Sequence, residues 1–148
     1  IRPLFPKDMR NDVSVVATVM SVDPDCSPEI AALWGVSTAI AISNIPWDGP
    51  VSSVSLGLVD GKYVINPTLE ERAKTEMTVT VASTDSLVAM IEAGANEISN
   101  EVMFDGIMFA HEENKKIVEF IKSIVAEIGK ENTAVTLGNI ALARGIFG

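Results

Sequence analysis

The sequence is poor in the residues that build most compact catalytic and metal sites. Its 148 residues include one cysteine, Cys26, and one histidine, His111. A single cysteine excludes a disulfide within the chain, and a lone histidine without visible partners disfavours a structural zinc site or a nucleophile–histidine triad. The glycines match neither a phosphate-binding loop nor a dinucleotide fingerprint. The residues by themselves therefore predict a globular domain without a self-contained active site.

Positive charge is also scarce. The chain has 11 Lys and Arg residues against 20 Asp and Glu residues, which gives a net charge of −9. Non-specific binding of nucleic acid needs clustered Lys and Arg that neutralise phosphates, so the overall composition argues against it. A domain of net negative charge can still carry a small basic patch on its surface. Arg2, Lys7 and Arg10 cluster near the start and are the candidates, although a solvated loop would carry the same residues.

Long apolar runs and a secretion signal are missing too. No stretch of eighteen residues is free of polar side chains, as a membrane-spanning helix would require, and no signal-peptide pattern occurs. A composition of 47% hydrophobic and 21% charged residues is typical of one globular domain. We expect a cytoplasmic location and no membrane partner. Because the chain starts at Ile1, inside a dense motif, we also expect it to be a segment of a longer protein.

What is present is organised around residues 27–43, SPEIAALWGVSTAIAIS. Ser27 can cap a helix, and Pro28 suits the first helical position. The body that follows has almost no charge, and a helix that is apolar nearly all round is expected to be buried. We predict a central helix with other structure packed on more than one side, where Gly35 permits close approach.

Alternating and β-branched segments predict strands around this helix. The Asp60-Gly61 pair is a strong hairpin signal. The segment 87–92 fits either a further strand or a short helix. The predicted strands are 13–22, 51–59, 62–65 and 77–82, with one or two helical turns at 69–74 and one long helix, or two in series, at 96–129. This order predicts an α/β or α+β layered domain.

The acidic residues offer one candidate for metal binding. Carboxylates are the preferred ligands of magnesium, and two groups lie before and after the predicted strand hairpin. Solvated turns and helix caps explain the same residues, and we favour that interpretation. The candidates are Asp23, Asp25, Glu29, Glu70, Glu71 and Glu76.

The opening letters IRPLFP closely resemble the end of the DRPIRPLFP motif of the bacterial polynucleotide phosphorylase family. The resemblance continues through residues 13–68 and 77–121, including the FAHE segment that contains His111. It covers Ile1 to about Lys130. Within this family the chain is similar to the later part of the first RNase PH-like repeat.

The resemblance implies an RNase PH-like fold, here without the first strands and helix of the repeat. Residues 1–49 would complete the first half of the repeat, residues 50–130 would form its second half, and residues 131–148 are an unassigned tail. Members of the family are polyribonucleotide nucleotidyltransferases, which degrade RNA from the 3′ end with inorganic phosphate and release nucleoside diphosphates. The implied parent contains a second, catalytic RNase PH-like repeat, requires Mg²⁺ and forms a homotrimer around an RNA channel. Partners in an RNA-degradation complex are a further expectation.

The resemblance also implies that this repeat is not catalytic. A serine-rich phosphate-binding run of the catalytic repeat is matched here by 27–29, Ser-Pro-Glu, where proline lacks a donor and the carboxylate repels phosphate. Aspartate and lysine positions of the catalytic repeat are matched by Thr78 and Thr80, and a further aspartate by a position near Arg72. Threonine supplies neither a carboxylate for a hard cation nor a charge for the transition state. We therefore expect no catalytic residue and no metal site in this chain.

The same resemblance places Arg2 in an arginine-rich motif near the RNA channel. We expect Arg2 to contact RNA or phosphate, followed by Lys7 and Arg10. Two alternatives stay open at this point. One is a self-sufficient RNase PH-type phosphorolytic ribonuclease in which Asp25, Glu29, Glu70 or Glu76 holds magnesium, and the other is a plain interaction module.

Overall fold

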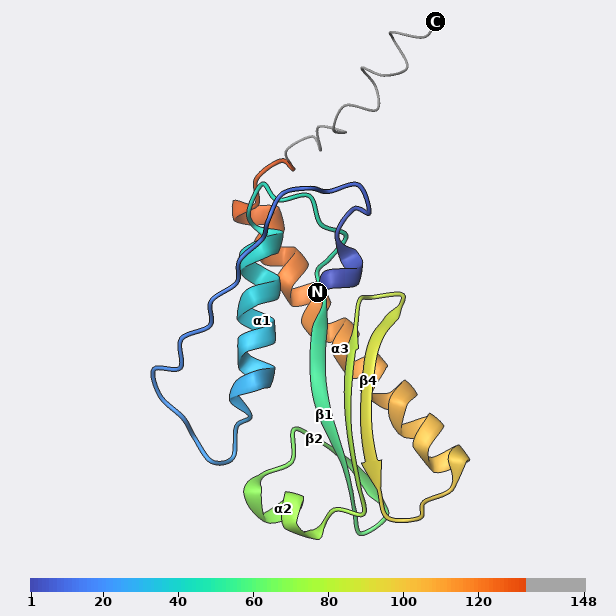
Figure 1. Cartoon of the computed structure of the whole chain (residues 1–148). Helices are drawn as coiled ribbons and strands as arrows, with labels where there is room; N and C mark the ends of the chain where they lie inside the picture. Colours follow the sequence, from blue (N-terminus) through green and yellow to red (C-terminus); the bar gives the residue numbers. More distant parts are fainter. Residues whose placement is uncertain (133–148) are drawn as a thin grey trace, which may run out of the picture.

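The computed structural model describes residues 1–132 and is built on a four-stranded antiparallel sheet in the order β2-β1-β3-β4. The strands are β1 (Ser52–Val59), β2 (Lys62–Ile65), β3 (Met77–Ser83) and β4 (Val88–Ala95). The long helix α3 (Asn100–Ile128) crosses one face of the sheet, and α1 (Pro28–Ala41) runs beside β1 (Figure 1). A short 3-10 turn, η1 (Arg2–Leu4), and α2 (Leu69–Lys74) complete the elements. The predicted α+β layered architecture is confirmed.

The hairpin between β1 and β2 forms where the sequence predicts it. Asp60 and Gly61 both adopt positive φ, at 49° and 70°, which is the backbone conformation that a two-residue hairpin turn requires. The turn sets the register in which Val59 faces Lys62 and Leu56 faces Ile65. The predicted strands 51–59 and 62–65 are therefore confirmed.

Strand β3 alternates as its sequence predicts. Met77, Val79 and Val81 are buried, whereas Thr78 is exposed and Thr80 is half-buried. The ambiguous segment after it is a strand, because β4 pairs with β3 from Met77↔Ala95 to Ser83↔Val88. This segment is a strand because β3 provides a pairing partner along its whole length, and the periodicity of the segment itself does not reveal that partner.

Helix α3 is one continuous helix rather than two. The Ser99 hydroxyl accepts a hydrogen bond from Val102 N at 3.3 Å and caps the helix, just after Glu97 adopts a positive φ of 52°. This explains why the helix begins later than residue 96. Its inward side packs on the sheet. Ala110 of the helix and the strand residues Val54, Leu56, Leu58, Met77, Val79 and Val81 form the main core.

Helix α1 covers the part of β1 that β2 does not reach. Trp34 Nε1 donates to the Ser53 carbonyl at 2.8 Å, and the Ser37 hydroxyl accepts from Val51 N at 3.0 Å. These bonds satisfy backbone groups at the start of the strand. One detail of the predicted helix start is wrong: Ser27 makes no capping bond to the backbone, because its hydroxyl donates to Glu29 at 2.6 Å instead.

The prediction that α1 is covered on more than one side is wrong for residues 1–132. Only Ile30, Ser37 and Ile40 are buried in this helix. The opposite side, which includes Gly35, faces an apolar groove of about 760 Å³ between α1 and residues 13–21. Figure 1 shows that segment running beside α1 as an extended connection.

The predicted strand at 13–22 is also wrong. These residues form no strand, and Val16 and Met20 are 83% and 90% exposed. β-branched residues favour extended backbone, but a strand also needs a neighbour to pair its N–H and C=O groups. Within residues 1–132 no strand pairs with this segment. No helix in this part of the chain is long and apolar enough to cross a membrane.

The bond between Ser37 and Val51 yields the first testable prediction. Ser37 is fully buried and Val51 is 1% exposed, so Ser37→Ala leaves the Val51 N–H without a partner. We expect the free energy of unfolding to fall by about 1–3 kcal/mol, measured by urea denaturation. Ser43→Ala, which removes a less buried hydroxyl at the end of the same helix, serves as the comparison. An equal effect of both variants would contradict the argument.

Candidate nucleic-acid interface

The motif IRPLF is held in place by its apolar residues. Ile1, Leu4 and Phe5 pack against a second core cluster of Ile40, Trp47, Val51 and Ala82. Trp47 Nε1 donates to the Ile1 carbonyl at 3.2 Å, Asp48 N donates to the Leu4 carbonyl at 2.8 Å, and the Phe5 and Trp47 rings lie 6.3 Å apart. The one charged side chain inside this motif, Arg2, remains exposed. The motif thus presents a guanidinium group on an anchored backbone.

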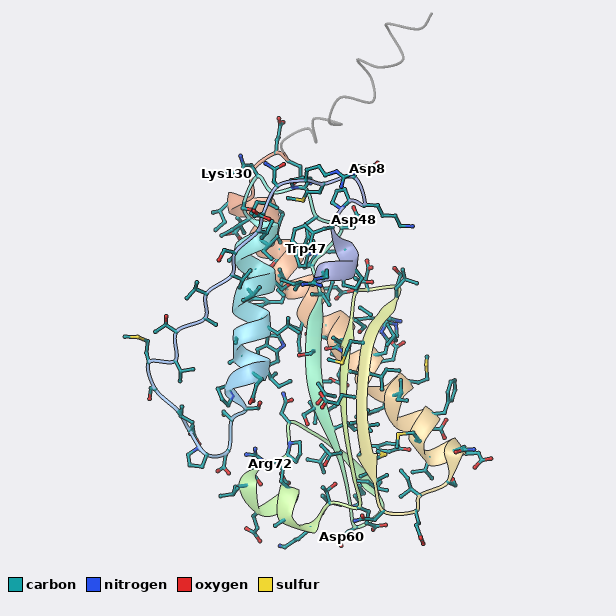
Figure 2. All side chains as sticks on the ribbon, in the orientation of Figure 1. Asp8, Trp47, Asp48, Asp60, Arg72 and Lys130 are labelled. Atoms are coloured by element: carbon teal, nitrogen blue, oxygen red, sulfur yellow. The ribbon has the colours of Figure 1, made fainter. Side chains whose placement is uncertain are left out.

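Lys7 and Arg10 follow on the connection that crosses the same end of the molecule. Figure 2 places Asp8, which lies between them in sequence, at the end where Trp47 and Lys130 are found. Both basic side chains are exposed. Within residues 1–132, neither they nor Arg2 take part in an ion pair or a side-chain hydrogen bond. The structure therefore brings the three predicted contact residues to one end of the molecule.

Most other basic side chains of the described segment are occupied. Arg72 donates to the backbone carbonyls of Pro24 and Thr68. Four lysines form ion pairs, namely Lys74 with Glu70, Lys115 with Glu112, Lys116 with Glu113, and Lys122 with Asp85. The two remaining lysines are Lys130, at the same end as Trp47, and Lys62, next to Asp60 at the opposite end (Figure 2). Four of the five unpaired cations in residues 1–132 thus gather at one end.

Lys130 was not a candidate from sequence. It follows α3 directly, and its backbone N–H donates to the Ile42 carbonyl at the end of α1 at 3.2 Å. Lys130 lies at the same end as Trp47 because the ends of α1 and α3 come together, and no local pattern carries that information.

The acidic candidates have the contacts of turns and helix caps. Asp25 accepts from Leu69 N at 2.9 Å, and Glu71 forms a capping box with Thr68. The Ser27 hydroxyl lowers the pKa of the Glu29 carboxyl, and the Lys74 ammonium lowers the pKa of the Glu70 carboxyl. In the part of the chain that the structure describes, no three His, Cys, Asp or Glu side chains gather as a metal site would require. These residues do not fit Mg²⁺.

Thr78 and Thr80, which the resemblance aligns with catalytic positions, lie on the sheet face opposite α3. Thr80 faces Glu92 of β4 and Thr78 faces Gly94, so hydroxyl groups and one neighbouring carboxylate occupy this part of the sheet. Arg72, near the third matched position, lies on α2 and is directed to the 23–25 turn. This arrangement lacks the paired charges that phosphoryl transfer requires.

Comparison with known proteins gives the family. Residues 49–113 match the model of the 3′ exoribonuclease family, domain 2. The chain is 58% identical over 137 residues to polyribonucleotide nucleotidyltransferase of Clostridioides difficile, covering 93% of this chain and 20% of that protein. It is 61% identical over 130 residues to the protein of the same name from Ruminiclostridium cellulolyticum, covering 88% and 18%. The chain thus spans about a fifth of the length of these curated relatives.

A solved structure supports the fold. The crystal structure of rice (Oryza sativa) Rrp46 superimposes with a TM-score of 0.62 at 16% identity, over 71% of this chain and 51% of the rice chain. At this identity the likeness concerns the fold alone, and it agrees with the RNase PH-like arrangement of sheet and helices. The chain therefore corresponds in sequence to one RNase PH-like segment of the bacterial proteins named polyribonucleotide nucleotidyltransferase.

Proposed function

We propose that this chain is the RNA-handling, non-catalytic part of a phosphate-dependent 3′-to-5′ exoribonuclease. The observation that carries the proposal is the gathering of unpaired cations at one end, with Arg2 fixed by the packing of Ile1, Leu4 and Phe5 on Trp47. Exposed Lys and Arg side chains without carboxylate partners are available to neutralise phosphates. On a chain of net charge −9 such a local patch would fix where RNA can approach.

We propose that the chain is not catalytic because of the side chains on the sheet face opposite α3. Thr78 and Thr80 carry neutral hydroxyl groups. Among the acidic candidates, Asp25 accepts a bond from a backbone N–H, Glu71 caps α2 and Glu70 forms an ion pair. In the proposed parent, Mg²⁺ and inorganic phosphate bind to the second RNase PH-like repeat. The parent would be a homotrimer with an RNA channel in the cytoplasm, where it joins partners in RNA degradation.

We also propose how the chain is divided between the two halves of the RNase PH-like repeat. Residues 1–49 would belong to the first half of the repeat and residues 50–130 to its second half, which is consistent with the family match at 49–113. Of the expected tail 131–148, residues 133–148 lie outside the described part of the chain.

The test of the RNA contact is Arg2→Ala in the 148-residue chain. We expect binding of a fluorescent oligo(A) to weaken about fivefold at low salt, because one phosphate contact is lost, and Arg2→Glu to weaken it further. The slope of log affinity against log salt should fall by about one. Fluorescence anisotropy measures both quantities.

Lys62→Ala is the matched control, because Lys62 is also exposed and without an acidic partner but lies at the opposite end. We expect this variant to bind oligo(A) like the unmodified chain. Equal effects of Arg2→Ala and Lys62→Ala would show that RNA responds only to net charge. That result would contradict a defined contact at Arg2 and favour a plain interaction module.

A further inference from the structure

A second cavity, of about 330 Å³, lies where the ends of α1 and α3 meet the 45–50 loop. It shares Ile40 and Ile45 with the apolar groove along α1 but, unlike that groove, it is lined by positive charge. Two lysines line it, one from α3 and one from the residues that follow α3. The lining residues are Ile40, Ala41, Ile45, Trp47, Gly49, Pro50, Lys122, Val125, Lys130 and Asn132.

Both lysines are positioned by contacts on the protein. The Lys130 backbone is tied to the end of α1 by its bond to the Ile42 carbonyl, while its side chain has no partner within residues 1–132. Lys122 is fixed on α3 and pairs with Asp85 from the β3–β4 connection. The Lys130 ammonium group is therefore free to bind an anionic ligand. The Lys122 ammonium group is paired with the Asp85 carboxylate, which an anionic ligand can displace.

Two helix C-termini border this cavity, and their exposed carbonyls would repel an anion. Near α1 these carbonyls are engaged. The Thr38 carbonyl accepts from Ile42 N, the Ile40 carbonyl accepts from both the backbone and the hydroxyl of Ser43, and the Ile42 carbonyl accepts from Lys130 N. At the end of α3, Gly129 N donates to the Val125 carbonyl at 2.8 Å. The repulsion that an anion would meet is thereby reduced.

The acidic side chains next to the lining residues leave the cavity cationic. Asp48 and Glu131, the sequence neighbours of Gly49 and Lys130, are both exposed, where solvent screens their charge. Asp85 is held by Lys122, and that ion pair lowers the pKa of the Asp85 carboxyl. The apolar part of the lining, which includes Trp47, can contact the sugar or base beside a bound phosphate.

We infer that the cavity formed by Lys122, Lys130 and the 45–50 loop is a binding site for a phosphate group. The ligand is either a phosphodiester of RNA or free inorganic phosphate. This rests on the proposed function, because it extends the RNA-contacting end from Arg2, Lys7 and Arg10 to the junction of α1 and α3. A cavity of this size accommodates a phosphate with its ribose.

Lys130→Ala, tested in the full 148-residue chain, should weaken oligo(A) binding about threefold to fivefold. Lys130→Glu should weaken it further, and Asp85→Asn should strengthen it about twofold because Lys122 is released. That gain should vanish when Lys122→Ala is added. Lys62→Ala is the control of equal charge, and far-UV circular dichroism verifies that each variant is folded.

The two tryptophans separate the two sources of phosphate. Trp47 lines the cavity, whereas Trp34 lies away from it and is hydrogen-bonded to Ser53. In a 1H–15N spectrum the indole N–H signal of Trp47 is therefore the probe, and that of Trp34 is the internal control. A shift of the Trp47 signal by inorganic phosphate, lost in Lys130→Ala, would identify a free-phosphate site. A shift by oligo(A) but not by phosphate would identify an RNA-backbone site, and either result supports the inference.

The inference is overturned if neither ligand shifts Trp47, or if Lys130→Ala and Lys62→Ala bind oligo(A) alike. Its failure is distinguishable from failure of the proposed function. An effect of Arg2→Ala without an effect of Lys130→Ala removes the cavity site and keeps the proposed function. An effect of Lys130→Ala alone keeps the cavity site and removes the role of Arg2.

Discussion

Trp47→Ala is expected to lower the free energy of unfolding by about 3–5 kcal/mol. Trp47 is only 7% exposed and forms the centre of the cluster that holds Ile1, Leu4 and Phe5. Its loss removes a large apolar contact, the bond to the Ile1 carbonyl and the ring contact with Phe5. Urea denaturation followed by circular dichroism measures the change.

The same variant should also weaken RNA binding, because η1 loses the surface that positions Arg2. Under conditions where the variant is folded, its affinity for oligo(A) should fall at least to that of Arg2→Ala. Trp47→Phe, which keeps an aromatic ring but not the N–H donor, should retain most of the stability. Trp34→Ala is the control, since it disturbs the contact of α1 with β1 rather than that of η1. Normal RNA affinity of folded Trp47→Ala would contradict the role of this anchor.

Leu56→Ala is expected to lower the free energy of unfolding by about 2–5 kcal/mol, because it opens a cavity in the main core. Leu56 is fully buried on β1, under α3. Gly106 of α3 lies directly above it: a methyl group added there would be 2.9 Å from Leu56 Cδ2 and 3.0 Å from Met77 Cε. The helix approaches the sheet closely at this point because Gly106 has no side chain.

This contact predicts that Gly106→Ala and Leu56→Ala do not have additive effects. Alone, the alanine at residue 106 crowds Leu56, whereas beside Leu56→Ala it fills part of the cavity. The double variant should therefore be more stable than the sum of the single changes by about 0.5–3 kcal/mol. Leu56→Ala combined with Ser37→Ala, which is not in this contact, should be close to additive. Additive effects of the first pair would contradict the packing described for Gly106.

The sequence predicts the elements whose signals are local. Asp60-Gly61 determines its hairpin by backbone conformation alone, and the alternation in β3 reflects one face covered by α3. Residues 13–22 have an equally strong strand composition but form none, because strand formation depends on a partner that the segment itself does not contain. The strand at 88–95 could not be distinguished from a helix for the same reason.

In the candidate site, too, some residues can be identified from local sequence and others only from the tertiary structure. Arg2, Lys7 and Arg10 lie close together in the sequence, and Arg2 is part of the IRPLFP motif. Lys130 reaches the same end only through the meeting of α1 and α3, and Lys122 is part of it only because α3 is one unbroken helix. Such convergence is a property of the tertiary structure, and no spacing rule in the sequence contains it.

We propose that this segment handles RNA but does not cleave it. The most direct test incubates the purified 148-residue chain with oligo(A), inorganic phosphate and Mg²⁺, with a full-length polyribonucleotide nucleotidyltransferase in parallel. We expect no release of nucleoside diphosphate by the chain while the full-length enzyme is active. Clear turnover by the chain that disappears in Asp25→Asn or Glu76→Gln would contradict the account, because it would place the chemistry on acidic residues of this segment.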